Sequence, residues 1–261
     1  MTGPDLYGGD MGWRNCIVLM SGICLLAAFV SAPASAQTRV GEAAVIKNQV
    51  HRVAGSAASQ INVGDSVVRD EVVRTGLDSA ARLVMADSTN LSLGPNATIT
   101  LDRTVFNDEH SYREIAIRLA TGAFRFVTGH SAKTAYKITT SLATIGVRGT
   151  ILDILSQNVL GKGQGTQPTQ GLPSKQVIVV LQEGAARVCT LGGQCVELTE
   201  RGQTAIITST GGKVTIQKTN SPPWTFASNC GAAAGLCTVT NFADATPPGD
   251  GSDPTGMLCG R

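Results

Sequence analysis

The feature that most constrains the fold of this chain is a repeated alternation of apolar and polar residues between Val40 and Gln217. Leu91 and Leu93 alternate with polar neighbours, and the same pattern recurs at Ile99 and Leu101. A period of two residues is typical of β-strands with one buried face. The strands that this pattern predicts lie at 66–68, 71–74, 82–85, 90–93, 98–101, 114–119, 123–127, 136–140, 151–155, 176–181, 186–189, 195–199, 204–207 and 213–217. Short strands at roughly 8–12-residue spacing predict an all-β fold, which is a roll, a solenoid or a sandwich.

The composition agrees with a folded domain and argues against polyanionic partners. Only 15% of the 261 residues are charged and 42% are hydrophobic, so the chain has enough apolar side chains to form a core. The formal net charge is +2, and the basic residues form no cluster along the sequence. We therefore expect no binding to nucleic acid and no electrostatic binding to anionic lipid.

The N-terminal segment has the features of a signal peptide. An uncharged apolar run of about fifteen residues, Cys16–Val30, is shorter than the roughly 20 residues of a membrane-spanning helix. Ala34 and Ala36 then form the small-x-small pattern that precedes a cleavage site. We expect residues 1–36 to be removed and the protein to be periplasmic or secreted, with an uncleaved N-terminal anchor as the alternative. Met11 is an alternative start to the first methionine.

The cysteines that remain after cleavage are expected to form disulfides, because export leads to an oxidising compartment. Cys189 and Cys195 flank a Gly-Gly turn between two predicted strands, so they face one another across a hairpin. Cys230 and Cys237 form a second candidate pair, and the state of Cys259 stays open. The spacing is not Cys-x-x-Cys and no histidine is close in the sequence, so we expect no metal site and no cofactor.

Two segments interrupt the strand pattern. Residues 156–175 are rich in Gly, Gln and Pro, which predicts a mobile surface loop that is accessible to a partner. Residues 219–261 predict a disordered tail, in which Trp224 and Phe226 dock onto the β domain. The β domain itself is expected to span residues 37–218.

Several fragments follow one another in an order that is typical of a known family. These fragments are INVGD at 61–65, VVRTG at 72–76, SAARLVMADS at 79–88, LSLGPNA at 91–97, LATGAFR at 119–125, ATIGVRGT at 143–150 and VVLQEGAARV at 179–188. Over about 61–207, this succession resembles the periplasmic FecR domain. The signature residues that carry the resemblance are Gly76, Gly122, Gly146, Val147, Arg148, Gly149, Thr150 and Gly184.

These signature residues also have a physical interpretation. We expect the glycines to lie at strand ends, where a positive φ angle or a close backbone approach excludes larger residues. Arg148 lies in an otherwise apolar stretch. We therefore expect a structural role, with its guanidinium bound by backbone carbonyls or by a carboxylate such as Asp153 or Glu183.

The resemblance implies a role in signalling at the cell envelope. In the family's signalling members, the domain receives information from an outer-membrane TonB-dependent receptor and relays it to a cytoplasmic sigma factor. This sequence resembles an export-only member, because no cytoplasmic anti-sigma segment precedes its apolar run. The resemblance thus implies a non-enzymatic interaction module that binds an envelope receptor or membrane sensor, and leaves iron-related sigma-factor signalling open.

A search for catalytic residues finds no recognisable set. The GHSAK sequence at 129–133 lacks the second glycine of a nucleophile elbow and contains no Ser-x-x-Lys. His51, His110 and His130 are far apart in the sequence, and nothing in it supports a triad. We therefore expect no enzyme activity. The alternatives are a glycan- or small-molecule-binding envelope protein, whose pocket Trp224 and Tyr136 would line, and a hydrolase with an unrecognised site.

Overall fold

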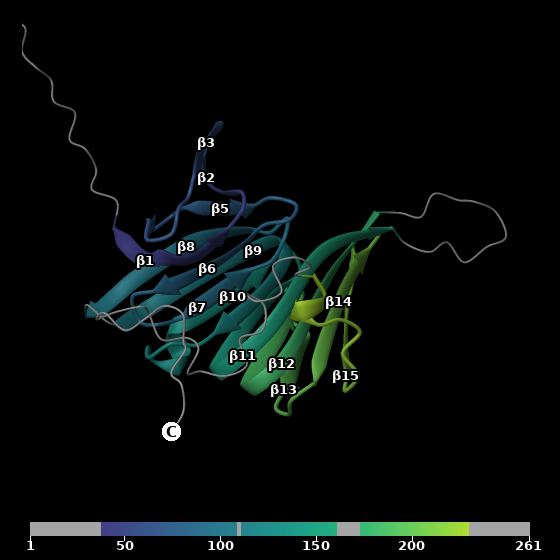
Figure 1. Cartoon of the computed structure of the whole chain (residues 1–261). Coiled ribbons are helices and arrows are strands. Elements are labelled where there is room, and N and C mark those ends of the chain that lie inside the picture. The colour runs from purple at the N-terminus through teal and green to yellow at the C-terminus, as the bar shows by residue number, and fades with distance from the viewer. Residues whose placement is uncertain (1–37, 109–110, 161–172, 230–261) are drawn as a thin grey trace, which may run out of the picture. The chain divides into compact units, whose positions relative to one another are not determined.

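The computed structural model describes residues 38–108, 111–160 and 173–229 (Figure 1). The strands are β1 Arg39–Lys47, β2 Val50–Ala54, β3 Ala57–Gln60, β4 Ser66–Val68, β5 Val72–Thr75, β6 Ala80–Met85, β7 Asn90–Leu93, β8 Thr98–Asp108, β9 Ser111–Val127, β10 Tyr136–Thr140, β11 Ala143–Leu160, β12 Pro173–Thr190, β13 Cys195–Leu198, β14 Thr204–Thr210 and β15 Lys213–Thr219. Two short 3-10 helices are η1 Lys133–Ala135 and η2 Phe226–Asn229. Within these ranges, no helix has the length and apolar character needed to cross a membrane.

The strands form where the sequence alternates, and β9 illustrates the cause. Ile115, Ile117 and Leu119 are buried, whereas Arg113 before them and Arg118 between the last two are exposed. Successive side chains of a strand point to opposite faces, so this sequence gives one apolar and one polar face. The all-β prediction is confirmed.

All fifteen strands belong to one mixed sheet, which follows two hydrogen-bonded paths. One path, here called arm A, runs β3–β2–β5–β8–β9–β10–β11–β12–β13, and the other, arm B, runs β15–β14–β12–β11–β9–β7–β6–β1–β4. The long strands β9, β11 and β12 belong to both arms, and Figure 1 shows β11 and β12 running side by side. Among the described strands, only β9 and β10 pair in parallel.

The three shared strands bend at signature glycines where they pass from one arm to the other. Gly122, Gly149 and Gly184 have φ angles of 106°, 60° and 81°, which side chains strongly disfavour. A Cβ on Gly184 would lie 1.8 Å from the carbonyl oxygen of Gly149, and one on Gly122 would lie 2.4 Å from Ala97 Cα. The sequence predicted glycines at strand ends, but these three lie inside continuous strands, because hydrogen bonding resumes beyond each bend.

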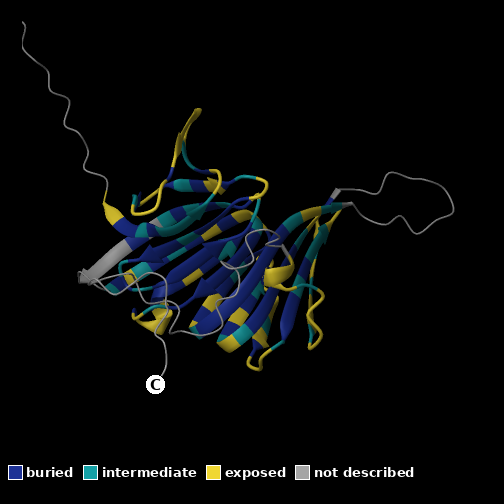
Figure 2. Ribbon diagram, viewed as in Figure 1, coloured by how far each residue is buried: buried dark blue, intermediate teal, exposed yellow. Residues whose placement is uncertain are grey.

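A single core lies between the two arms. Ile117 and Ile145 of arm A belong to the same buried cluster as Phe124, Leu152 and Val179 of arm B. Exposed positions concentrate elsewhere, as at β3, all of whose residues are exposed (Figure 2). The sheet therefore folds over on itself around one core, which is the roll among the arrangements that the sequence left open.

A second buried cluster covers the outer face of arm B. Phe226 is fully buried against Ala123, Leu155 and Ile178, and Trp224 packs against the same cluster. The prediction that Trp224 and Phe226 dock onto the β domain is confirmed. It also explains why the run at 177–181 is apolar without alternation, because both faces of β12 are covered there.

The strands β11 and β12 extend further than their sequences predict. Residues 156–160 pair with 173–177 in regular antiparallel register, although we expected a loop over 156–175. Polar side chains here bond to one another rather than to solvent alone: Gln157 Nε2 donates to Gln176 Oε1 at 3.1 Å. The loop prediction is therefore wrong for residues 156–160 and 173–175, which form a polar two-stranded ribbon.

Several predicted features lie outside the described residues. These are the signal peptide at 1–36 with Ala34 and Ala36, the middle of the predicted loop at 161–172, and the part of the predicted tail at 230–261 that contains Cys230, Cys237 and Cys259.

Candidate functional site

The clearest candidate site lies on the exposed face of β10 to β13 in arm A. Cross-strand pairing forms a row of four exposed residues there: Lys137, Gly146, Arg187 and Glu197. Residues that pair directly across neighbouring strands point to the same face of a sheet. The row therefore forms part of the outer surface of arm A, opposite the core.

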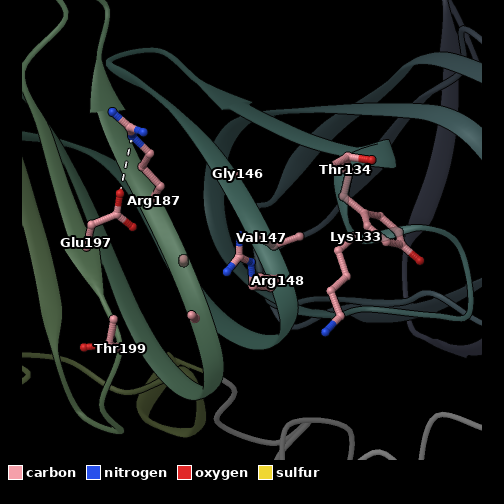
Figure 3. A pocket seen from close by; sticks show the side chains of 11 residues that line it. Lys133, Thr134, Gly146, Val147, Arg148, Arg187, Glu197 and Thr199 are labelled. Carbon is pink, nitrogen blue, oxygen red and sulfur yellow. Dashed lines mark ion pairs between the residues drawn. The ribbon is translucent and has the colours of Figure 1, made fainter.

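A shallow groove of about 570 Å³ overlaps this row (Figure 3). Its lining residues are Lys133, Thr134, Tyr136, Gly146, Val147, Arg148, Ala185, Ala186, Arg187, Glu197 and Thr199. Gly146 leaves open space where a Cβ would project, and its neighbour on the same face, Ala185, has only a methyl group. Small residues thus form the floor, and longer charged side chains form the rim. We call this surface the cationic groove.

Two cations lie at one end of the cationic groove. Arg148 is an exposed residue of β11 and pairs with Ala185, and Lys133 extends from η1. The Lys133 Cε atom would be 3.8 Å from a Cβ placed on Gly149, so its side chain passes over the bend next to Arg148. The missing side chain of Gly149 therefore leaves space beside Lys133.

The other end of the groove carries both signs of charge. Arg187 and Glu197 form an ion pair with an N–O distance of 3.4 Å, and their side chains are 65% and 59% exposed. By contrast, Lys133, Lys137 and Arg148 form no ion pair with any residue that the structure describes. The groove and its margin therefore carry an excess of positive charge.

The prediction for Arg148 is wrong in its details. The side chain is exposed and forms no hydrogen bond or ion pair with the described residues, while its backbone N–H donates to Thr150 Oγ1 at 2.9 Å. Asp153, which we expected as a partner, instead accepts hydrogen bonds from Arg125 at 2.6 and 2.9 Å and from Gln182 at 2.8 Å. The cause is the alternation of β11, in which Val147 points into the core and Arg148 points outward.

Thr150 is the signature residue that holds the bend together. It is fully buried, accepts the Arg148 N–H bond, and donates its hydroxyl to the Ala185 carbonyl at 3.0 Å. Its backbone N–H donates to Thr128 Oγ1, and its carbonyl accepts from the Thr128 hydroxyl at 2.9 Å. Within the GVRGT sequence, Gly149 and Thr150 therefore form and stabilise the bend, while Arg148 faces solvent.

A buried polar network lies behind the cationic groove. Asp87 Oδ2 accepts hydrogen bonds from the hydroxyls of Ser131 at 2.6 Å and Tyr136 at 2.7 Å, and its Oδ1 accepts from the Thr89 N–H at 2.9 Å. Burial raises the pKa of Tyr136 to about 12, so its hydroxyl stays a donor at physiological pH. The Tyr136 ring packs edge-on against Phe126 at a centroid distance of 5.8 Å. This network fixes β10 on the turn at Asp87.

The described residues offer no alternative site with a catalytic or metal-binding arrangement. No group of three or more His, Cys, Asp or Glu side chains comes together in the parts of the chain that the structure describes. Ser131 donates to Asp87 rather than to a histidine, and His130 is exposed. Burial raises the pKa of Glu71, but the Val68 N–H and Arg52 bind that carboxylate. Glu71 therefore stabilises the turn between Val68 and itself.

The remaining sequence-predicted residues are two signature glycines, Gly76 and Gly146, and the cysteine pair of the predicted hairpin. Gly76 is closely packed, since a Cβ there would lie 3.0 Å from Ser79 Oγ, whereas Gly146 has no such constraint. Cys189 and Cys195 pair directly across β12 and β13 and form a disulfide, with Cα atoms 4.0 Å apart, as predicted. The disulfide therefore fixes the register of β13 at the edge of arm A.

Sequence reasoning missed Lys133, Lys137, Arg187 and Glu197 as site residues. One local signal was present, because the pairing of Cys189 with Cys195 places Arg187 opposite Glu197 two residues further along the hairpin. The approach of Lys133 and Lys137 to this hairpin depends on β10 pairing with β11, and no short sequence pattern reveals that pairing.

The fold and the groove define a class of protein: an all-β domain with a rolled mixed sheet and an exposed cationic sheet face. Residues 71–187 match the family model described as FecR protein, so the chain contains a FecR domain. The matched range includes every signature residue from Gly76 to Gly184. The resemblance recognised from the sequence is therefore confirmed.

The solved structures that align with this chain share little sequence with it. Two structures of a candidate anti-sigma factor from Parabacteroides distasonis ATCC 8503, at 2.50 and 1.65 Å resolution, align with TM-scores of 0.41 and 0.39. In both cases the identity is 13%, and the alignment covers 56% of this chain and 58% of that chain. The chain thus matches little more than half the length of these proteins. No curated protein matches the sequence.

Proposed function

We propose that this protein is an exported FecR-domain signalling module that acts without catalysis, by binding another protein of the cell envelope. The observation that carries the proposal is the orientation of Arg148 in the FecR signature. Its side chain is exposed and contributes no hydrogen bond to the described fold, while its neighbours Gly149 and Thr150 form the bend. An exposed arginine on a rigid sheet is well placed to bind a partner.

The N-terminal sequence supports the location of this partner. The apolar run and the small-x-small pattern at Ala34–Ala36 direct the mature chain, beginning at Gln37, to the periplasm or beyond. A receptor or a membrane sensor of the envelope is the class of partner that the FecR domain suggests.

The glycan-binding alternative loses its main support. That alternative required Trp224 and Tyr136 to line one pocket, but Trp224 packs on the outer face of arm B and Tyr136 lies under the cationic groove of arm A. The two rings therefore do not form a joint stacking surface for a sugar.

The experiment expresses the full chain with a C-terminal tag in its own cell envelope, crosslinks intact cells, and identifies what copurifies. Recovery of one receptor or membrane sensor supports the proposal, and mass spectrometry of the same material reports the mature N-terminus. A folded, abundant protein that crosslinks to no envelope protein would refute the proposed function. Peptides that cross Ala36–Gln37 in exported material would refute the cleavage site.

A further inference from the structure

We infer that the cationic groove binds an extended segment of the partner protein, with carboxylates at the end that lies over Lys133 and Arg148. This inference rests on the proposed function, because it names the chemistry that the partner presents. The observation behind it is a group of exposed cations that form no ion pair with the described residues. Two exposed pairs in arm A are different in this respect: Arg118 binds Asp102 at 2.6 Å, and Arg187 binds Glu197 at 3.4 Å.

Lys133 and Arg148 at one end of the groove, and Lys137 at its margin, lack such partners within the described residues. Lys133 comes from η1, Lys137 from β10 and Arg148 from β11, so three separate elements bring positive charge to one surface. Like charges repel one another, and their gathering gives no stability to the isolated domain. A ligand with carboxylates would relieve this repulsion and would form charge-assisted hydrogen bonds with Arg148.

The floor of the groove favours close approach of a backbone. Gly146 has no side chain and Ala185 has a single methyl group, and these two residues lie between the charged rims. The distance from β10 to β13 is three strand spacings, or about 14 Å. An extended segment of about five residues spans that distance.

The Glu197 end selects a protein segment over a uniform polyanion. Glu197 is 59% exposed and lines the groove, but Arg187 pairs with its carboxylate and Lys218 donates to its carbonyl oxygen at 2.7 Å, so this end presents both signs of charge rather than a uniformly cationic surface for a polyanion. A protein segment with acidic residues at one end and a donor or a cation at the other end matches both ends. The shape and the charges together therefore assign the ligand to an extended protein segment of mixed charge.

The first experiment measures binding of a fluorescent peptide to the purified mature chain by anisotropy. The probe is a peptide of alternating Glu and Ser that ends in Lys, long enough to cover the groove, and the control probe replaces each Glu by Gln. Lys133→Glu with Arg148→Glu is expected to weaken binding of the acidic probe about tenfold or more. The matched control Lys213→Glu reverses an exposed lysine at the start of β15 in arm B and is expected to leave binding within about twofold.

Three results would overturn the inference. The first is equal binding of the acidic and the Gln probes, and the second is equal loss of affinity in Lys133→Glu with Arg148→Glu and in Lys213→Glu. The third result is a concentration-dependent dimer that Arg148→Glu dissociates, since the occupant would then be a second copy of this chain.

Circular dichroism and the melting temperature identify a variant that fails to fold. In that case Lys133→Glu alone, at an exposed position of η1, repeats the test.

Glu197→Gln separates a protein segment from a polyanion. Removing the carboxylate is expected to weaken binding of the Lys-terminated probe, because the donor end of the probe loses its partner. The same substitution would tighten binding of dextran sulfate, a uniform polyanion, because it removes a repulsion. Tighter binding of the peptide probe to Glu197→Gln, together with preference for dextran sulfate, would overturn the inference in favour of an anionic polymer.

The crosslinking experiment in cells distinguishes this inference from the proposed function. If the wild-type chain and the Lys133→Glu, Arg148→Glu variant crosslink equally to one envelope protein, the groove inference fails and the proposed function stands. If the wild-type chain crosslinks to none while the acidic probe binds through the groove, the proposed function fails and the binding chemistry stands. If crosslinking is lost only in the groove variant, both stand.

Discussion

The ion pair between Arg125 and Asp153 allows a sharp test of how this fold is stabilised. The two residues pair across β9 and β11 on the outer face of arm B, where their side chains are 11% and 0% exposed. Asp153 also accepts a bond from Gln182 at 2.8 Å, and the Phe226 ring lies over the guanidinium at 5.2 Å. The segment that ends in η2 therefore shields this pair from solvent.

Arg125→Met removes the charge but keeps a long apolar side chain beneath Phe226. The carboxylate of Asp153 would then be buried with a single neutral donor from Gln182, so we expect a loss of about 3–5 kcal/mol in the free energy of unfolding. For a domain of this size, that loss lowers the melting temperature by roughly 6–20 °C. Replacing both partners, Arg125→Met with Asp153→Leu, is expected to recover at least half of the loss, because no uncompensated charge stays buried.

The exposed pair Arg118–Asp102 is a matched control for distance. Its N–O distance is also 2.6 Å, but its side chains are 59% and 42% exposed, so Arg118→Met is expected to cost less than about 1 kcal/mol. Urea unfolding followed by circular dichroism measures all four proteins under the same conditions. Equal losses for Arg125→Met and Arg118→Met, or no recovery in the double variant, would refute the claim that burial rather than distance determines the cost.

Three further predictions concern the bends, the buried tyrosine and the disulfide. Gly184→Val is expected to abolish cooperative folding, because its Cβ would lie 1.8 Å from the Gly149 oxygen, whereas Gly146→Ala is expected to change stability by less than about 1 kcal/mol in the same urea assay. Burial raises the pKa of Tyr136 from 10.0 to about 12, so the folded state keeps a proton that the unfolded state loses between these values. The resulting stability is complete below about pH 10 and is lost as the pH rises to about 12, and a flat urea midpoint over this range would contradict it. Cys189→Ser removes a disulfide with a sequence separation of 6 and is expected to cost about 2 kcal/mol, an effect that reduction of the wild type should reproduce.

The positions of strands were largely predictable because one face of each strand is buried. What the sequence did not reveal is which predicted strands are continuous. The segments at 114–119 and 123–127 form the single strand β9, although Thr121 and Gly122 between them break the alternation. A glycine bend and a glycine turn look alike in one sequence, and only the partners β8, β7 and β11 determine that the ladder resumes after Gly122.

The candidate site was harder to predict, because it depends on which face of each strand points outward. Arg148 lies in an otherwise apolar stretch, which led to the expectation that its guanidinium is bound within the fold. The alternation of β11 turns Arg148 outward, and the bend at Gly149 shifts the register only beyond it, between Arg148 and Ile151. The sequence also did not reveal the excess of positive charge, because Lys133, Lys137 and Arg148 come from three separate elements that only the fold brings together.

The same bend connects the two properties that we assign to the GVRGT sequence. A Cβ on Gly184 would lie 1.8 Å from the Gly149 carbonyl oxygen, and Gly149 itself has a φ angle of 60°, which disfavours a side chain, so β11 and β12 keep a fixed relation where they leave arm A. Arg148 precedes this bend directly and Ala185 follows it, so the groove floor is built on the most constrained backbone of the shared strands. A rigid base lowers the entropy cost of binding. A signature that must be present for folding can therefore also present an exposed side chain: Gly149 and Thr150 form the bend, and Arg148 is the residue that we propose for the partner.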